Sequence, residues 1–459
     1  MPRPKPALPR TGREAALRAL RDVDVKAAYA NLALDHHLSG SKLEGRERAL
    51  ATELAYGVTR RRATLDWAIS QVAARPLEKM DPWVRNILRE AVYQILYMDR
   101  IPHSAAVDQA VELAKQYGHA GVAKFVNGVL RNLIRRLPEL QWPDEAADPV
   151  RALAVQHSYP EWLVAQWLER FGRGEAVRLL EAGNQVPPLT VRVNRLKATR
   201  EEAAAALAEE GVRTEPTRHS PQGLIIHDLT SASWLDRLQA MKRGLITVQD
   251  ESSMLAAAVV APQPGWTVID VAAAPGGKAT HLAELMDNQG QVIALDIHPH
   301  KVDLIEQNAE RLGTTIVQAL CLDARRVGEA MPGRADAILC DLPCSGLGTL
   351  ARRPDARWRK SPADAAALVP VQRAILESAA KALKPGGVLV YSTCTIQAAE
   401  NEELVEAFVA DHPEFRFDTI WDYLPESISR EGQAEGYVQL LPHVHGTDGF
   451  FIARMVKKG

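Results

Sequence analysis

Asp270-Val-Ala-Ala-Ala-Pro-Gly-Gly-Lys278 is the stretch that decides the fold of this chain. Residues 266–271, which lead into it, are apolar and β-branched and predict a buried strand, and residues 279–286 after it have helical spacing. A strand, a glycine turn and a helix in this order place backbone N–H groups at a helix start, where they can face a nucleotide. The stretch therefore predicts a nucleotide-type cradle in an α/β domain.

The cradle lacks the residues that two common nucleotide loops use to bind phosphate. A Walker loop requires glycine where this chain has Ala272 and Ser or Thr where it has Ala279, and the dinucleotide pattern G-x-G-x-x-G is missing. Residues 291–296 predict the next strand, which ends in Asp296, the usual position of a carboxylate that binds ribose hydroxyls. S-adenosylmethionine, which has adenosine but no pyrophosphate, fits both observations. An ordinary tight turn between strand and helix is the alternative.

The four cysteines of the sequence are too few for a disulfide framework. Cys321 and Cys340 lie inside apolar runs, so we expect them to pack in the core. Cys344 and Cys394 instead each follow the end of a predicted strand. Open α/β sheets bind their ligands at the carboxyl ends of the strands. If these strands neighbour the one that leads into the cofactor loop, both thiols and the methyl donor meet at one edge of the sheet.

Two thiols beside a methyl donor suit methylation of a pyrimidine carbon. C5 of cytosine is a poor nucleophile, but a thiolate that adds to C6 turns C5 into an enamine-like carbon that can attack a sulfonium methyl. The proton left on C5 must then be removed, and a second thiol or thiolate can act as that base. Asp341, close before Cys344, could hydrogen-bond the ring N3 or the exocyclic amine of the base.

Three motifs resemble those of the RNA cytosine-C5 methyltransferases: Ala-Ala-Pro-Gly-Gly-Lys at 273–278, Asp-Leu-Pro-Cys-Ser-Gly at 341–346 and Ser-Thr-Cys-Thr at 392–395. The resemblance implies that Cys394 is the nucleophile and that Cys344 assists release of the product; the spacing alone does not assign these roles. It also implies S-adenosylmethionine as cofactor. The implied cofactor contacts are Ala272, Ala273, Ala274, Pro275, Gly276, Gly277, Lys278, Asp296, Asp323 and Asp341.

Two of these residues have a second interpretation. Asp323 could accept a hydrogen bond from the adenine amine, or it could cap the turn that follows it. Lys278 could reach the target base, or it could brace the loop. The departures from the family pattern at Ala272, Leu342 and Thr395 remove no reacting group.

The first 140 residues differ in character from the rest. Apolar residues recur at helical spacing from residue 11 onward, and 23 lysines and arginines stand against 15 acidic residues, although the whole chain has a net charge of −2. Residues 100–110 and 124–131 resemble the RNA-binding antitermination factor NusB. A NusB-like domain in front of a cytosine-C5 methyltransferase is typical of the bacterial enzymes of the 16S rRNA methyltransferase B branch. The resemblance implies 16S ribosomal RNA as substrate and partner.

A strand over 189–194, a helix over 200–210 and two further extended pieces predict a small α+β module. In the resembling family this module contributes to RNA binding, and Arg192-Val-Asn194 is its recognisable core. Arg192 and Asn194 could contact RNA, or they could be polar groups that satisfy the strand end.

Other basic residues are candidates for contacts to RNA phosphates. Arg352, Arg353 and Arg357 follow the Pro-Cys motif in a glycine-rich and then basic loop, which resembles the family loop beside the target base. The groups at 60–62 and 131–136 would also suit phosphates, although such clusters are often solvated helix faces.

The expected architecture is multidomain. We expect an all-helical NusB-like RNA-binding domain over 1–145, which begins with a short disordered arm, and linker helices with an α+β RNA-recognition module over 150–245. A Rossmann-like α/β domain, an S-adenosylmethionine-dependent methyltransferase, is expected over 246–459.

The sequence also excludes some classes of protein and partner. No apolar run approaches the ~20 residues that span a bilayer, and the absence of a C-x-x-C pair argues against a metal site. We expect a monomeric, cytoplasmic enzyme without membrane or DNA partners. Two alternatives stay open: the same reaction on transfer RNA, and an RNA-binding ribosome-assembly factor whose methyltransferase domain is inactive.

Overall fold

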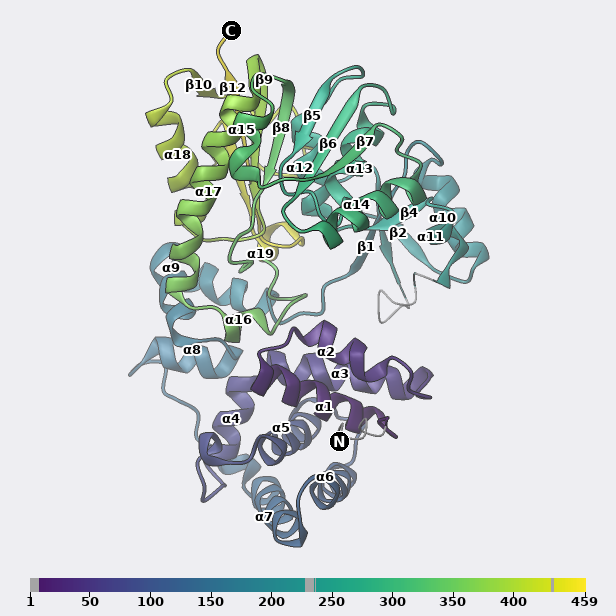
Figure 1. The fold of residues 1–459 in the computed structure, drawn as a ribbon. Helices are drawn as coiled ribbons and strands as arrows, with labels where there is room; N and C mark the ends of the chain where they lie inside the picture. The colour runs from purple at the N-terminus through teal and green to yellow at the C-terminus, as the bar shows by residue number, and fades with distance from the viewer. Residues whose placement is uncertain (1–7, 228–234, 236, 431–432) are drawn as a thin grey trace, which may run out of the picture. The chain divides into compact units, whose positions relative to one another are not determined.

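The computed structural model describes residues 8–227, 235, 237–430 and 433–459. These residues form two compact units, each of which has its own core (Figure 1). Unit 1 extends to Gln185 and also contains Leu350–Arg359, whereas unit 2 contains Val186–Thr349 and Lys360–Gly459. Most of the predicted N-terminal arm lies outside the described residues.

Unit 1 is helical, as the periodicity predicts, and its first helices pack around a shared apolar core that contains Leu17, Leu54 and Leu88. Local signals set the helix ends: Asp81 accepts a hydrogen bond from Trp83 N at the start of α5, where proline occupies the first turn. Its helices are α1 (Gly12–Lys26), α2 (Ala30–Leu38), α3 (Gly45–Arg60), α4 (Arg62–Ser70), η1 (Leu77–Lys79), α5 (Pro82–Tyr97), α6 (His103–Tyr117), α7 (Ala120–Arg136), η2 (Leu137–Glu139), α8 (Pro149–His157), α9 (Glu161–Ala182) and α16 (Ala356–Arg359).

Unit 2 begins with the predicted α+β module. An antiparallel sheet of order β2-β3-β1-β4 packs against α10, and Val191, Val193 and Leu207 are buried between them. A capping box of Thr199 and Glu202 starts α10. The elements are β1 (Leu189–Val193), α10 (Arg200–Glu209), β2 (Thr214–Pro216), β3 (Gly223–Ile226), α11 (Gln239–Lys242) and β4 (Ile246–Val248).

The rest of unit 2 is a mixed sheet of order β10-β12-β9-β8-β5-β6-β7, with β11 paired to β12. Strands β9, β8, β5, β6 and β7 are parallel, and the pairings of β12 are antiparallel. The elements are α12 (Glu251–Val260), β5 (Thr267–Asp270), α13 (Gly277–Leu285), β6 (Gln291–Asp296), α14 (Pro299–Leu312), β7 (Val317–Cys321), η4 (Ala324–Arg326), α15 (Val327–Ala330), β8 (Ala335–Asp341), α17 (Pro362–Ala382), β9 (Leu383–Thr393), η5 (Ala398–Glu400), α18 (Glu402–Asp411), β10 (Phe415–Phe417), β11 (Tyr437–Leu440), α19 (Pro442–His445) and β12 (Phe450–Lys457).

Helices cover both faces of this sheet (Figure 1), which explains why its central strands are apolar without alternation. Val268 packs in a core with residues of α12 and α13, while its neighbour Ile269 packs in a second core with residues of α15 and α17. The same alternation separates Leu339 from Ile338 on β8. The result is the predicted Rossmann-like domain.

The strand order brings the three predicted loop motifs together. β5 pairs with β8 and β8 pairs with β9, so that Asp341 lies opposite Ser392 at the carboxyl ends of their strands. The prediction for Cys340 is confirmed because this residue is fully buried, but the prediction for Cys321 is wrong. Cys321 is exposed because it ends β7, the edge strand of the sheet.

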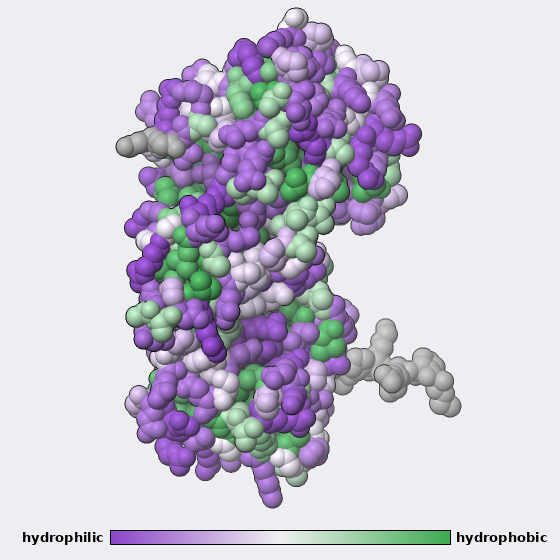
Figure 2. Space-filling model, turned by 90° about the vertical axis from the view of Figure 1, so that its left-hand side faces the viewer, coloured by the Kyte–Doolittle hydropathy of each residue, from purple (hydrophilic) through white to green (hydrophobic). Residues whose placement is uncertain are grey.

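Figure 2 shows that hydrophilic residues dominate the face of the molecule that it presents. Within the described ranges, no helix is both long enough and apolar enough to span a membrane.

Candidate active site

The two predicted catalytic thiols lie together. The Sγ atoms of Cys344 and Cys394 are 3.4 Å apart, a separation at which one thiol can donate a hydrogen bond to the other sulfur. The pairing of β8 with β9 continues into the loops, because Leu342 N donates to the carbonyl oxygen of Ser392 at 3.0 Å. Beyond the thiols, Gly348 N donates to the carbonyl oxygen of Cys394 at 3.0 Å. Backbone hydrogen bonds on both sides thus fix the separation of the sulfurs.

A buried carboxylate that the sequence analysis missed ties the two cysteine loops together. Glu400 is 0% exposed and accepts hydrogen bonds from the amide and the hydroxyl of Ser345, at 2.8 and 2.5 Å. The Ser345 hydroxyl also meets the Thr395 hydroxyl at 2.7 Å, and Gln372 donates to Glu400 at 3.0 Å. Each of the two hydroxyl residues directly follows a cysteine. The sequence signal was weak, because a Glu just before α18 resembles an ordinary helix-start residue.

The protonation of Cys344 follows from this packing. Its hydrogen bond with Cys394 raises the pKa of the Cys344 thiol well above the ordinary value, and burial and the negative charges of Cys394, Glu400 and Asp341 raise it further. Cys344 therefore keeps its proton at neutral pH.

Lys278 supplies the nearby positive charge. Its Nζ donates to Asp341 at 2.7 Å and lies 5.3 Å from the centre of the Phe450 ring, while Ser392 donates to the other oxygen of Asp341 at 2.9 Å. Burial acts to lower the pKa of Lys278, but the negative charges of Asp341, Asp270 and Cys394 outweigh it and raise that pKa. Lys278 is thus an ammonium ion paired with Asp341 at the end of β8, and both of its predicted roles, at the target base and in the loop, stay predictions.

The cofactor loop is the connection from β5 to α13, as predicted. Ala273 N donates to the carbonyl oxygen of Leu295 at 2.8 Å, which ties the loop to β6, and Gly276 has a φ of +102°, a conformation that favours glycine. Pro275 accepts a hydrogen bond from Asn308 of α14 at 2.8 Å. The loop ends at Gly277, where α13 begins and where first-turn N–H groups lack intrahelical acceptors.

The environment of the Asp270 carboxyl group indicates whether the site fits the expected cofactor. It ends β5, is 1% exposed, and neither of its carboxyl oxygens accepts a hydrogen bond from the described residues. Burial and, secondly, the charge of Asp341 raise the pKa of Asp270 to about 7. The positive charge of Lys278 opposes these effects only in part, and a cationic ligand would further lower the cost of burying the Asp270 carboxylate. S-adenosylmethionine carries a sulfonium and an ammonium group, so the residues present fit it.

The two other predicted acidic contacts lie at strand ends of the same sheet. Asp296, the last residue of β6, is 7% exposed and accepts a hydrogen bond from His298 N at 2.9 Å. Asp323 caps η4 by accepting from Arg325 N at 3.0 Å, which is the alternative interpretation given above. Its contact to adenine stays a prediction.

Three of the predicted RNA contacts are wrong because the side chains are fully buried. Arg192 and Asn194 are each 0% exposed and form hydrogen bonds within unit 2, so their alternative role as internal polar groups is correct. Arg357 is 0% exposed in unit 1, where it donates to the carbonyl oxygens of Ser158 and Gly183 at 3.0 Å. Arg352, which is half-buried, and Arg353, which is exposed, stay predictions.

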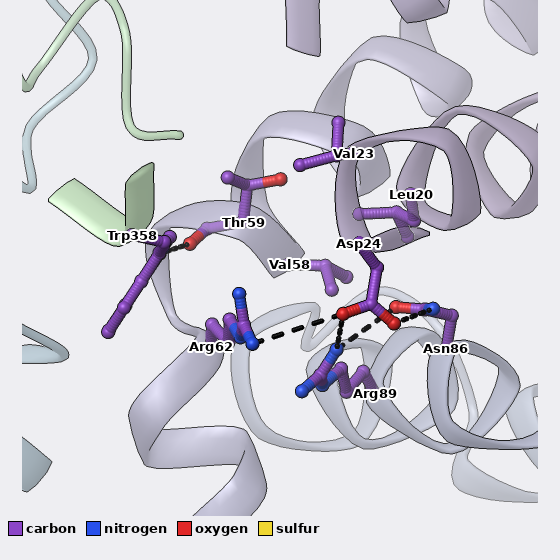
Figure 3. A pocket seen from close by; sticks show the side chains of 9 residues that line it. All are labelled: Leu20, Val23, Asp24, Val58, Thr59, Arg62, Asn86, Arg89 and Trp358. Carbon is purple, nitrogen blue, oxygen red and sulfur yellow. Dashed lines mark hydrogen bonds and ion pairs between the residues drawn. The ribbon is translucent and has the colours of Figure 1, made fainter. Parts of the chain in front are cut away.

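One residue of the arginine group at 60–62 is also buried, and the other two are half-buried. Arg60 is 7% exposed, and Figure 3 shows Arg62 beside Arg89 and Asp24 in a small cavity of unit 1. The cavity volume is about 20 Å³, enough for about one water molecule and too little for a ligand. Its lining residues are Leu20, Val23, Asp24, Val58, Thr59, Arg62, Asn86, Arg89 and Trp358.

Three family models match successive parts of this chain, and full-length relatives match nearly all of it. A model of the family "16S rRNA methyltransferase RsmB/F" matches residues 257–456, a model of the NusB family matches 10–135, and a model of an RsmF/B-like ferredoxin-like domain matches 159–232. The probable ribosomal RNA small subunit methyltransferase B of Bacillus subtilis is 42% identical over 97% of this chain and 99% of its own length. The ribosomal RNA small subunit methyltransferase B of Sodalis glossinidius is 34% identical over 91% of each chain.

Solved structures show the same fold. The crystal structure of PH0851 aligns with a TM-score of 0.81 at 30% identity and covers 99% of this chain and all of its own. The crystal structure of NSun6 from Pyrococcus horikoshii with SFG has a TM-score of 0.59 at 26% identity and covers 66% of this chain.

Proposed function

Because this chain belongs to the 16S rRNA methyltransferase RsmB/F family, whose members methylate ribosomal RNA with S-adenosylmethionine, we propose that it methylates C5 of a cytosine in 16S rRNA. We propose further that the reaction proceeds through a covalent bond between Cys394 and C6 of the base. The single observation that carries the proposal is the pair of thiols, 3.4 Å apart, at the carboxyl edge of the sheet that also bears the cofactor loop.

The charge distribution supports Cys394 as the nucleophile. Cys344 holds its proton and can donate a hydrogen bond to the Cys394 sulfur. Lys278 is an ammonium ion that interacts electrostatically with Cys394. Both interactions favour the thiolate of Cys394, the reactive form. The thiolate adds to C6, forming the S–C6 bond, and the C5=C6 electron pair becomes available at C5. S-adenosylmethionine, when bound, would supply a methyl group that accepts this pair while the methyl–sulfur bond breaks and its electrons return to the sulfonium sulfur, which leaves as the neutral thioether.

The same electrostatics suggest how Cys344 acts at release. Once Cys394 is bonded to C6, its sulfur is a neutral thioether, so the hydrogen bond with Cys394, which is the largest influence that raises the pKa of Cys344, is weakened and the charge of Cys394 is gone. Cys344 can then lose its proton to solvent and take the proton from C5. The electrons of the C5–H bond re-form the C5=C6 double bond, and the Cys394 thiolate leaves.

Asp341 is best suited to the exocyclic amine of the cytosine. Lys278 and Ser392 each donate a hydrogen bond to it, one to each of its two carboxyl oxygens. A carboxylate accepts hydrogen bonds and cannot donate one to the ring N3. Of the two contacts considered from the sequence, the amine therefore fits the observed hydrogen bonds better.

Residues of the cofactor loop, Asp270, Asp296 and Asp323 would hold S-adenosylmethionine. Gly277 and Lys278, in the first turn of α13, would present backbone N–H groups, and Asp296 would bind the ribose hydroxyls. Asp270 would face the cationic part of the ligand, since neither of its oxygens is satisfied by the described residues.

Cofactor affinity should therefore depend on pH. The pKa of Asp270 is raised to about 7, so the carboxylate that attracts a cation forms as the pH rises through that value. We expect the Kd for S-adenosylmethionine, measured by calorimetry, to fall about eightfold between about pH 6 and about pH 7.5, because the ionised fraction rises by that factor. Asp270→Asn should bind more weakly and without this pH dependence. A wild-type Kd that stays constant over this range would contradict the assignment.

The activity itself is tested with methyl-labelled cofactor and purified RNA. We expect label in small-subunit ribosomal RNA, and nuclease digestion should recover it as 5-methylcytidine. Label only in transfer RNA would change the substrate, label at another atom would refute the chemistry, and no label in free RNA or in assembled small subunits would favour an inactive assembly factor.

A further inference from the structure

Arg192 extends from the α+β module to the cofactor loop. This side chain, at the centre of the family's Arg-Val-Asn motif, leaves β1 and is 0% exposed. It donates to the carbonyl oxygen of Gly277 at 2.6 Å, to the hydroxyl of Thr280 at 3.1 Å and to the carboxylate of Glu284 at 2.7 Å. It also donates to the side chain of Gln249. Glu284 is itself 0% exposed, so the ion pair is fully enclosed.

The contact to Gly277 bears directly on the cofactor loop. The carbonyl group of Gly277 and the N–H group of Lys278 belong to one planar peptide, so an arginine that fixes the oxygen also fixes the direction of that N–H. This N–H lies in the first turn of α13, where it has no intrahelical acceptor and is available to a ligand. Thr280 adds a second tie, because its hydroxyl donates to the carbonyl oxygen of Gly276 at 2.8 Å.

The other side of the loop is anchored to the same module. Asn194 donates to the carbonyl oxygen of Leu312 at 2.8 Å, and Arg311 donates to the carbonyl oxygen of Ile246 at 3.0 Å, so the end of α14 is tied to the module. One turn earlier, Asn308 of α14 donates to the loop. The module therefore holds both helices that flank the cofactor loop.

We propose that Arg192 is a positioning residue for the cofactor loop, and that the Arg-Val-Asn core of the α+β module sets the affinity for S-adenosylmethionine and not the affinity for RNA. The inference rests on the proposed function in one respect, namely that S-adenosylmethionine is the ligand of the loop. Its physical basis is the rigid path from the Arg192 guanidinium to the Lys278 N–H group.

The test measures two affinities separately. Arg192→Lys keeps a cation beside Glu284 but cannot reproduce the guanidinium's several directed hydrogen bonds. We expect its Kd for S-adenosylmethionine, measured by calorimetry, to rise about tenfold, while its Kd for small-subunit RNA stays within about twofold of wild type. Saturating cofactor should restore most of kcat, since the thiols are untouched.

Arg195→Lys is the matched control. Arg195 lies three residues further along, is exposed and pairs with Asp287 at 3.0 Å, so this variant makes the same arginine-to-lysine change on the module's surface. We expect it to leave the Kd for S-adenosylmethionine unchanged. Should Arg192→Lys fail to fold, Thr280→Val replaces it, because this change keeps the ion pair and removes only the hydroxyl ties; we expect a smaller rise, about threefold.

The outcomes separate the inference from the proposed function. Wild-type protein that binds no S-adenosylmethionine would refute the proposed function. Wild-type binding together with unchanged cofactor affinity in both Arg192→Lys and Thr280→Val would overturn the inference alone. An Arg192→Lys variant that loses RNA affinity and keeps cofactor affinity would also overturn the inference, and would support a role for Arg192 in RNA binding.

Discussion

Cys394→Ala should bind S-adenosylmethionine normally and transfer no measurable methyl group. The substitution removes the sulfur that would attack C6, and without that attack C5 does not become nucleophilic. We expect kcat to fall on the order of 10⁴-fold or more, as for other enzymes that lose their nucleophile. Single-turnover transfer of labelled methyl measures the loss, and calorimetry with S-adenosylmethionine checks that the site is intact.

Two controls make this result specific. Cys321→Ala removes an exposed thiol at the end of β7 and should have wild-type activity, which excludes a general effect of losing a thiol. Cys394→Ser keeps a hydroxyl of similar shape but should be nearly as inactive, because the hydroxyl has a far higher pKa than a thiol. Turnover of Cys394→Ala within tenfold of wild type would exclude Cys394 as the nucleophile.

Cys344→Ala should trap the enzyme on its RNA. The S–C6 bond and methyl transfer need only Cys394, whereas the following loss of the C5 proton needs a base, which we assign to Cys344. We expect turnover to fall by about 10³-fold, the usual contribution of a general base, while a covalent protein–RNA adduct accumulates. The adduct should appear as a species of reduced mobility in a denaturing gel.

The double variant tests the order of the two steps. Cys344→Ala combined with Cys394→Ala should form no adduct, since the bond to C6 comes from Cys394. An adduct in the double variant would reverse the roles of the thiols. Normal turnover without an adduct in Cys344→Ala would show that another group, or solvent, removes the proton.

Much of the site could be predicted because its signals are local. The cofactor loop, the strand before it and the acidic residue that ends β6 are short segments with distinctive composition. The rule that ligands bind at the carboxyl ends of parallel strands then brings Cys344 and Cys394 together without knowledge of the structure. Their observed separation of 3.4 Å agrees with that expectation, whereas their chemical roles stay predictions.

The failures concern residues whose partners are distant in the sequence. Arg192 and Arg357 lie in segments that the family resemblance associates with RNA, yet their partners lie 92 and 199 residues away, at Glu284 and Ser158. Glu400 was overlooked for a related reason, because its tie to Ser345 spans 55 residues. A sequence pattern gives the chemistry of a side chain but does not show which face of an element is covered.

The sequence by itself determined the order of the elements, the glycine turn between β5 and α13 and the placement of Cys344 and Cys394 after neighbouring strands, because strand and helix periodicity and loop composition act over a few residues. Only the tertiary structure decided the protonation of Cys344, the unsatisfied carboxylate of Asp270 and the burial of Arg192. These properties depend on desolvation and on charges a few ångströms away, and both are set by how distant segments pack.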